Sequence, residues 1–511
     1  MKPCAGVAPL NRRALIRAAV GLTLCVIGIF LARRESYEVH TVFATAGGCN
    51  MPTDIYEARS GTSVGSVVLF HGLSANRKVM AFSAQEFANQ DLRVFVPDLP
   101  GHGKTSGPFS PQRVETCAEA LVRDLAARKA ILPERTLLAG HSMGGAIATR
   151  VAAHFAVACV IAISPAPMHP APGVSPELLL FPEPPVLAAH ALVLSASSEP
   201  ASIRQIAKEL VTESVNSTNR YDTIPNTTHV SILFSHAAFE AMRSWTSQIL
   251  GTNPTAPFPK NMPAIGCIFG IVGLSILAPP FLREMSPSRD APLAPDSNPP
   301  HSVARTALFL ALFSSLAVAL LHFFIPFQFL HIFQGGYFAS FLFLVGIAMS
   351  IVHRRAVPRM KSFFNSSTAA SSAAAILLVL LYGAWFELTF YEAWLTPSRW
   401  LRFPLLALVL VPWHLAEELF LGDPASRPRF RRLMHFLAFR TILWLVLIAA
   451  IFYLHSGQFV FVLLVVYFLL FSLLQRMASD VIRARTRSVP AATIFGAILL
   501  AAFALAILPV A

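Results

Sequence analysis

The sequence predicts an α/β domain built on a parallel sheet, joined to an all-α domain that crosses a membrane several times. Within residues 33–255, short β-rich apolar runs alternate with helix-like stretches, which is typical of a parallel sheet with helices on both faces. Residues 256–511 consist mostly of apolar runs of about membrane-spanning length. Hydrophobic residues make up 55% of the 511 residues and charged residues only 13%, which excludes an ordinary soluble protein.

Nine apolar runs predict membrane-spanning helices, one before the α/β domain and eight after it. The first run is long and is not followed by a small-residue cleavage site, so we expect residues 1–32 to be an uncleaved anchor rather than a signal peptide. Eight runs in succession argue against buried helices of a soluble protein. The runs cover residues 14–32, 263–282, 306–328, 336–352, 372–393, 403–421, 436–454, 458–475 and 490–510.

The distribution of positive charge predicts the topology. The formal net charge is +13, but the basic residues concentrate in alternate connections between the apolar runs, so the excess does not indicate a nucleic-acid partner. With a cytoplasmic N-terminus, the α/β domain lies outside the cytoplasm. Thirty-three arginines against seven lysines suggest a bacterial source, and hence an inner-membrane protein. The expected inside connections hold Arg283, Arg289, Arg305, Arg354, Arg355, Arg359, Lys361, Arg427, Arg429, Arg431, Arg432, Arg476, Arg483, Arg485 and Arg487.

Within the α/β domain, the elements follow one another in a regular order. We expect strands at 65–70, 92–97, 135–140, 157–163 and 191–196, helices at 76–90, 113–131 and 144–156, and two leading antiparallel strands at 37–45 and 53–59. The segment between the strands that end at 163 and begin at 191 is short and rich in proline, so any cap over the site is minimal. In sheets of this kind the functional groups lie at the carboxyl ends of the strands.

One motif in this domain carries chemistry. Residues 140–144 read Gly-His-Ser-Met-Gly, preceded by an apolar run and followed by a helix-forming run of small residues. The G-x-S-x-G pattern between a strand and a helix forms a tight turn that exposes the serine hydroxyl at the end of the sheet. Ser142 is therefore the candidate nucleophile, and it needs a base to take its proton.

Three stretches together resemble the α/β-hydrolase superfamily, in particular its monoacylglycerol-lipase and serine-aminopeptidase-like branch. They are Phe-His-Gly-Leu at 70–73, Val-Phe-Val-Pro-Asp-Leu-Pro-Gly-His-Gly-Lys-Thr at 94–105 and Gly-His-Ser-Met-Gly-Gly at 140–145. The resemblance covers residues 37–250. It departs from the family pattern at Pro100, where arginine is common, and at Thr105, where serine is common, and neither position carries chemistry directly.

The resemblance implies a complete site. The base should lie in a loop after the last strand, where His229 stands, whereas His236 falls inside the following helix at 231–249. Glu199 occupies the position of the acid after the strand at 191–196, where aspartate is more usual, and Asp222 is the alternative. The backbone N–H groups of Leu73 and Met143 form the oxyanion hole.

The expected function is a membrane-bound serine hydrolase that cleaves an acyl ester through an acyl-enzyme. The substrate is a small-molecule or lipid-like ester, no cofactor or metal is expected, and the lipid bilayer is the expected surroundings. One alternative is an acyltransferase with the same triad. Another is a transporter or membrane-assembly protein whose hydrolase-like domain only binds a ligand. The oligomeric state and the substrate stay open.

Other polar residues have a structural explanation that we prefer. Glu387 and Glu392 fall in one predicted span, and His414, Glu417 and Glu418 in another. A metal or proton site is conceivable there. However, Glu417 and Glu418 lie near the inside end of their span, where they can reach water or pair with Arg427 or Arg429. Two further questions stay open, namely whether Cys49 pairs with Cys117 and whether Leu178, Leu179, Leu180 and Phe181 touch lipid or pack on the sheet.

Overall fold

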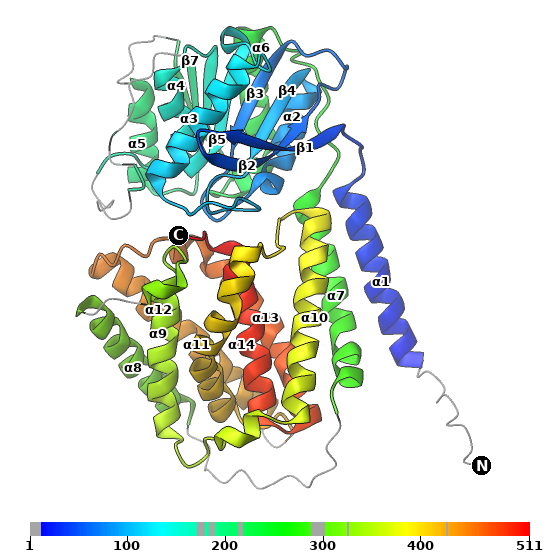
Figure 1. Cartoon of the computed structure of the whole chain (residues 1–511), viewed down its shortest axis with the longest axis vertical. Helices are drawn as coiled ribbons and strands as arrows, with labels where there is room; N and C mark the ends of the chain where they lie inside the picture. The colour runs from blue at the N-terminus through cyan, green and yellow to red at the C-terminus, as the bar shows by residue number, and fades with distance from the viewer. Residues whose placement is uncertain are drawn as a thin grey trace.

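The computed structural model places a sheet region over a bundle of long helices (Figure 1). It describes residues 12–170, 179–181, 183, 190–212, 218–287, 302–323, 327–425 and 428–511. We call residues 39–250 the sheet region and residues 263–507 the helix region. The N-terminal helix α1 (Arg12–Ala32) runs beside the helix region and leads into the first strand.

The sheet region contains one mixed eight-stranded sheet in the order β1-β2-β4-β3-β5-β6-β7-β8. The two leading strands pair antiparallel, as predicted, and β2 also pairs antiparallel with β4, whereas the other neighbours are parallel. The last strand was missed by the sequence analysis because its five residues are mostly polar and it lies at the sheet edge. The bounds are β1 (Val39–Ala46), β2 (Cys49–Tyr56), β3 (Gly65–Phe70), β4 (Leu92–Pro97), β5 (Thr136–His141), β6 (Cys159–Ile163), β7 (His190–Ala196) and β8 (Arg220–Ile224).

Helices cover both faces of this sheet, because successive strand residues point to opposite faces. Val68 and Phe70 of β3 pack in the core under α3, α4 and α5, and Val67 and Leu69 pack in the core under α2 and α6. The helices of the sheet region are η1 (Arg77–Met80), α2 (Ala81–Asn89), α3 (Pro111–Ala127), η2 (Pro133–Arg135), α4 (Met143–His154), α5 (Ala201–Thr212), η4 (Ser231–Phe234) and α6 (His236–Leu250).

The helix region supplies eight of the nine described helices that are long and apolar enough to cross a membrane; α1 is the ninth. This makes the chain a multi-pass membrane protein by length and composition. Glu392 was predicted inside a span, but α10 ends three residues before it, so it lies in the connection to α11. The helices are α7 (Pro263–Met285), α8 (Val303–Phe323), α9 (Gly335–Val352), α10 (Ser366–Thr389), α11 (Pro397–Leu421), α12 (Arg429–Tyr453), α13 (Val460–Thr486) and α14 (Val489–Ile507).

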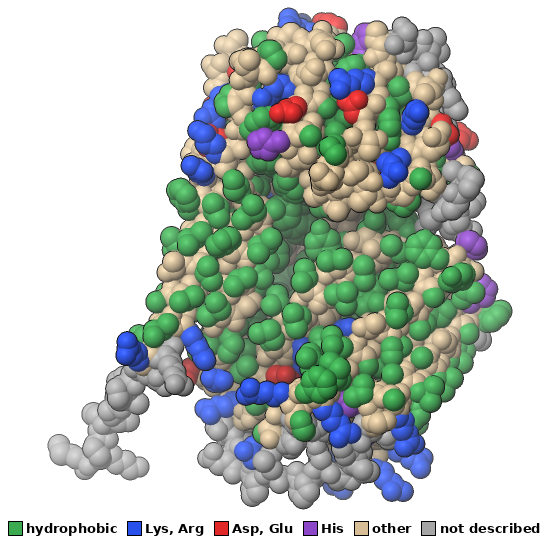
Figure 2. Space-filling view, turned by 180° about the vertical axis from the view of Figure 1, so that it is seen from behind, with side chains coloured by type: hydrophobic (Ala, Val, Ile, Leu, Met, Phe, Trp, Pro, Cys, Tyr) green, Lys and Arg blue, Asp and Glu red, His purple; other side chains and the backbone are tan. Residues whose placement is uncertain are grey.

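Two ends of the helix region differ in what they carry. The loops of the sheet region rest on one end, and Lys and Arg side chains gather at the opposite end (Figures 1 and 2). Between these ends, the surface in Figure 2 is mainly hydrophobic, as expected of helices that face acyl chains.

The chain's C-terminal residues join the two regions. The Val510 N–H donates to the Gly101 carbonyl at 3.0 Å, and the Phe109 N–H donates to the Val510 carbonyl at 2.6 Å. Arg399, at the start of α11, is almost fully buried and donates to the carbonyls of Gly101 and Gly103 at 3.1 and 3.2 Å. The loop after β4 is therefore held by groups from the far end of the sequence.

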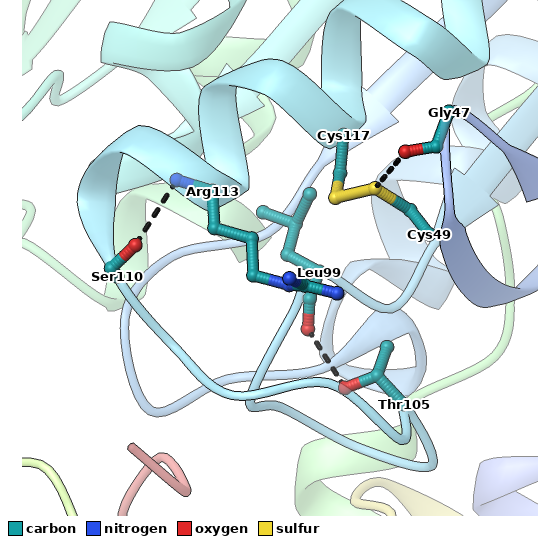
Figure 3. Close-up of a disulfide and its surroundings, with 7 residues drawn as sticks. All are labelled: Gly47, Cys49, Leu99, Thr105, Ser110, Arg113 and Cys117. Carbon is teal, nitrogen blue, oxygen red and sulfur yellow. Dashed lines mark hydrogen bonds between the residues drawn. A yellow bond between two sulfur atoms is a disulfide. The ribbon is translucent and has the colours of Figure 1, made fainter.

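A disulfide ties the leading hairpin to the sheet region (Figure 3). Cys49 at the start of β2 is bonded to Cys117 of α3, with the two Cα atoms 5.7 Å apart. The sequence left this pairing open. The bond closes a loop of 68 residues, which limits the freedom of the unfolded chain.

Candidate active site

Ser142 stands in a strained turn between β5 and α4. Its φ of 55° and ψ of −119° place a non-glycine residue in a region that side chains rarely adopt. The turn is possible because its neighbours are glycines. A Cβ on Gly140 would lie 2.1 Å from the Gly144 carbonyl oxygen, and a Cβ on Gly144 would lie 2.2 Å from the Phe70 carbonyl oxygen. The motif thus fixes the local geometry that the sequence predicted for a nucleophile.

The structure brings the three predicted side chains into one hydrogen-bonded chain. The Ser142 Oγ lies 2.9 Å from Nε2 of His229, and Nδ1 of His229 lies 2.6 Å from Oε1 of Glu199. The second carboxylate oxygen of Glu199 accepts from the Ala196 N–H at 3.0 Å. Glu199 is buried, whereas 29% of the His229 side chain is exposed. A buried carboxylate that is held at both oxygens fixes the imidazole orientation, and the exposed ring stays accessible.

The two alternatives considered from the sequence lie elsewhere. His236 is the first residue of α6, and its ring packs against Phe258 at 4.3 Å between centroids. Asp222 lies within β8 and forms an ion pair with Arg220 at 2.6 Å. Each of these side chains is therefore engaged away from Ser142.

Two backbone N–H groups were predicted to form an oxyanion hole. Met143 is the first residue of α4, so its N–H is among the four that have no acceptor within the helix. Leu73 follows Gly72, which lies against the nucleophile: a Cβ on Gly72 would be 3.1 Å from the Ser142 Cβ. The loop after β3 therefore runs close beside the serine, as an oxyanion donor requires.

Two buried histidines shape the loops behind that donor. Nδ1 of His71 donates to the Gly72 carbonyl at 2.8 Å, and its Nε2 accepts from the Leu99 N–H at 2.9 Å. Burial lowers the pKa of His71 to about 4. His102 lies against His71, with ring centroids 5.1 Å apart, and burial lowers its pKa well below the usual value. Both rings are therefore neutral, and their hydrogen bonds to backbone groups hold the loops after β3 and β4.

His141 is a supporting residue that sequence reasoning did not single out. Its Nε2 lies 2.6 Å from the His229 carbonyl oxygen, so the protonated ring nitrogen donates to the backbone of the candidate base. Burial, and then the neighbouring His229, lower the pKa of His141 to about 3. The position of His141 next to Ser142 in the sequence could have indicated a supporting role for it. Its contact with His229 depends on the fold.

Comparison with known proteins bears on the fold of the sheet region. Residues 67–265 match the alpha/beta hydrolase family. With its mixed sheet and the elbow at Ser142, the sheet region thus has the α/β-hydrolase fold, and the helix region follows it as a separate set of long apolar helices. A search of curated proteins finds no match.

Several solved structures are similar to the α/β-hydrolase part. An esterase from Pyrococcus furiosus is 17% identical over 42% of this chain and 92% of its own, with a TM-score of 0.37. A predicted CIB-like hydrolase from Thermoplasma acidophilum is 18% identical over 42% and 100%, with a TM-score of 0.33. Est1E from Butyrivibrio proteoclasticus, solved with ferulic acid, is 17% identical over 41% and 99%, with a TM-score of 0.35.

The site lies on the side of the sheet region that faces the helix region. Leu73 packs against both the core of the sheet region and the core of the helix region. The hydroxyl of Tyr391, in the α10–α11 connection, donates to the Ser74 carbonyl at 2.9 Å. Phe234, in the short helix after His229, lies 6.1 Å from Phe390 between ring centroids. The loops that carry the oxyanion donor and the base thus both rest on the helix region.

The segment between β6 and β7 is described only in part. Leu178 lies outside the described residues, whereas Leu180 and Phe181 are buried in the core that covers one face of the sheet. For these two residues, packing is therefore the correct interpretation. The predicted minimal cap falls mostly on residues outside the described part of the chain.

The polar residues inside the helix region pair with one another. Glu417 accepts two hydrogen bonds from Arg440, at 2.9 and 3.0 Å, and Glu418 accepts one from Arg476 at 2.6 Å. The predicted pairing with Arg429 was wrong, because both glutamates point into the bundle, and Arg427 lies outside the described residues. His414 lies 3.4 Å from Glu417. In the described part of the chain, no group of three or more His, Cys, Asp and Glu side chains is arranged to hold a metal ion.

Proposed function

We propose that this protein is a membrane-bound serine hydrolase that cleaves an acyl ester of a lipid-like or amphipathic compound. The observation that carries the proposal is the continuous chain from Ser142 through His229 to Glu199, with distances of 2.9 and 2.6 Å. A serine that contacts a histidine, which in turn contacts a buried carboxylate, is the arrangement that activates a hydroxyl for attack.

The geometry assigns one step to each group. Nε2 of His229 takes the proton from the Ser142 hydroxyl as Oγ bonds to the acyl carbon. The N–H groups of Leu73 and Met143 then stabilise the negative charge on the former carbonyl oxygen, each worth about 2.7–4 kcal/mol in the transition state. His229 returns its proton to the leaving alcohol, and Glu199 stabilises the imidazolium between these steps.

Release of the acyl group repeats the same chemistry with water. His229 removes a proton from a water molecule, whose oxygen attacks the ester carbon of the acyl-enzyme. Breaking the bond to Ser142 returns the proton to Oγ and frees the carboxylic acid. An alcohol in place of that water would give transfer of the acyl group instead of hydrolysis.

The position of the site supports an amphipathic substrate. The loops carrying Leu73 and His229 rest on the helix region, so an ester that reaches Ser142 passes close to the membrane surface. Val230, beside the base, has 36% of its surface exposed. A substrate held in the bilayer by its acyl chain would present its ester bond at this level.

Active-site labelling tests the catalytic proposal. A fluorophosphonate probe should modify the purified full-length protein and should fail to modify Ser142→Ala, while Ser60→Ala, an exposed serine of the same region, should label normally. Folded wild-type protein that resists the probe would leave only a ligand-binding role for the sheet region. Esters of graded acyl length then test the substrate class. A strict preference for acetyl esters, with lipid esters left intact, would contradict the amphipathic substrate.

We further propose that the sheet region lies outside the cytoplasm of a bacterial cell, with the N-terminus inside. The Cys49–Cys117 disulfide supports an oxidising compartment, and the Lys and Arg side chains gathered at the far end of the helix region support a cytoplasmic location for that end. A periplasm-active reporter fused after residue 250 should be active, and a reporter active only in the cytoplasm should be silent at that position. The reverse result would invert the topology.

A further inference from the structure

A basic cavity lies at the end of the helix region that is far from the sheet region. It has a volume of about 630 Å³ and is bounded by α7, the end of α11, α12 and α13. Five arginines line it against a single carboxylate, which leaves a formal excess of four positive charges. The charged lining residues are Arg283, Arg429, Arg432, Arg476, Arg485 and Asp480.

One of the two buried arginines of this cavity is not fully satisfied. Arg432 and Arg476 are 6% and 7% exposed, and both form ion pairs with the one carboxylate of Asp480. The Nε–H of Arg476 has no hydrogen-bond acceptor among the described residues. A buried N–H of a charged group without an acceptor costs free energy, so an anion in the cavity would stabilise the folded protein.

The acidic side chains deeper in the bundle do not supply that anion. Glu417 is held by Arg440, and Glu418 is held by the Nη1 of Arg476. Arg483, a further buried arginine, lies 3.8 Å from Glu418. Counting Glu418 together with Asp480 lowers the formal excess of the cavity from four to three positive charges, and that excess remains.

The cavity also has an apolar wall that faces outward. Leu433, Leu473 and Met477 line it and are 46%, 47% and 51% exposed. They belong to α12 and α13, helices long and apolar enough to cross a membrane, so their exposed surfaces face acyl chains. A phosphate group among the arginines, with hydrocarbon along these side chains, would match both parts of the cavity. Inorganic phosphate or a soluble phosphate ester would leave the apolar wall without a partner.

We propose that this cavity binds the phosphate head group of an anionic phospholipid from the leaflet opposite the sheet region. The guanidinium groups of Arg429 and Arg485, which are exposed and line the cavity, receive the phosphate at the rim. Arg476 donates its free Nε–H from the interior. This site is separate from Ser142 and does not depend on the hydrolase proposal.

Native mass spectrometry of the full-length protein in detergent tests the proposal. Phosphatidylglycerol should remain bound to the wild type, and phosphatidylcholine at the same concentration should not. The double variant Arg429→Gln/Arg485→Gln should lose affinity for phosphatidylglycerol by about tenfold or more. Arg354→Gln is the matched control, because Arg354 is an exposed arginine at the same end of the helix region that does not line the cavity.

Two results would overturn the proposal. The first is equal binding of phosphatidylglycerol by the wild type and by the double variant. The second is displacement of the bound phosphatidylglycerol by millimolar inorganic phosphate, which would mean that the cavity takes a soluble anion rather than a lipid. A thermal-stability measurement of the double variant without added lipid shows that it is folded, so that loss of binding reports the site itself.

Discussion

Arg77 and Glu392 form a bidentate ion pair that joins the segment after β3, which carries Leu73, to the helix region. Nη2 of Arg77 donates to Oε1 of Glu392 at 2.9 Å, and Nη1 contacts the other carboxylate oxygen. Arg77 also binds Asp54 at 3.0 Å and contacts Asp98, and all four side chains are buried. Arg77, the first residue of η1, and Glu392, in the connection between α10 and α11, are 315 positions apart and thus share one charge cluster.

Removing the central cation of this cluster should destabilise the protein strongly. Arg77→Met leaves Asp54 and Asp98 buried without their cation and leaves Glu392 with Lys104 alone, which costs about 3–5 kcal/mol of folding free energy. Because Arg77 also positions the loop that carries Leu73, ester hydrolysis should fall with it. Thermal unfolding in detergent and initial rates would measure both effects.

The matched control for Arg77 is Arg93→Met. Arg93 binds Glu57 at 2.9 Å, but both side chains are partly exposed, so its loss should cost less than about 1 kcal/mol. Equal shifts of the unfolding temperature in the two variants would show that the cluster does not hold the two regions together.

The acid of the candidate triad is tested by an isosteric change. Glu199→Gln keeps the shape of the side chain, but its amide NH2 can donate to Nδ1 of His229 and so favour the wrong tautomer, and the neutral amide does not stabilise the imidazolium. We therefore expect kcat to fall by about 10⁴-fold. Asp222→Asn, the alternative acid, should keep wild-type activity because Asp222 pairs with Arg220 on β8. A large loss in Asp222→Asn, with activity retained in Glu199→Gln, would reverse the assignment.

Acid should destabilise the sheet region through His71. Burial lowers the pKa of His71 to about 4, whereas the unfolded chain binds a proton near pH 6.5, so the unfolded state holds more protons between these values. Stability is therefore lost as pH falls from about 6.5 toward 4, by roughly 3 kcal/mol from this group. In the folded state a proton on Nε2 would displace the Leu99 N–H that it accepts.

The measurement compares unfolding temperatures at pH 7.5 and pH 5. The wild type should lose more than His71→Gln, which can still accept from Leu99 but does not titrate. Burial, and then the Asp98 carboxylate, raise the pKa of Glu392 to about 7, so this group stabilises the folded protein as the pH falls. The contribution of Glu392 is the same in the wild type and in His71→Gln, so it does not affect the comparison. His154→Gln changes an exposed histidine and should lose as much stability at pH 5 as the wild type. The prediction fails if His71→Gln also loses as much stability as the wild type.

Loss of the disulfide should destabilise the leading hairpin. A loop of 68 residues corresponds to about 4 kcal/mol in the chain-entropy model, so Cys117→Ser should lower the unfolding temperature. Reductant should have the same effect on the wild type and none on the variant. Cys159→Ser is the control, because Cys159 is a free buried cysteine. This variant keeps the disulfide, so reductant should still lower its unfolding temperature. A wild type that ignores reductant would contradict the pairing.

The sequence by itself determined the local features of this protein. The spacing of glycines around Ser142 requires a tight turn, and the length of the apolar runs predicts the membrane-spanning helices, because both depend on residues that are near one another in the chain. The expected strands and the leading antiparallel pair follow from the same local patterns. The polar edge strand β8 was not predicted, because it lacks the alternation of apolar residues that marks a half-buried strand.

Only the tertiary structure decided which distant groups meet. In the structure Glu199, and not Asp222, contacts His229, and His141 donates a hydrogen bond to the His229 carbonyl. Glu417 pairs with Arg440, and Glu418 pairs with Arg476. The same holds for Arg77 and Glu392, whose contact spans most of the chain. The physical reason is that burial forces each charged group to find a partner, while the identity of the partner depends on how the sheet and the helices pack.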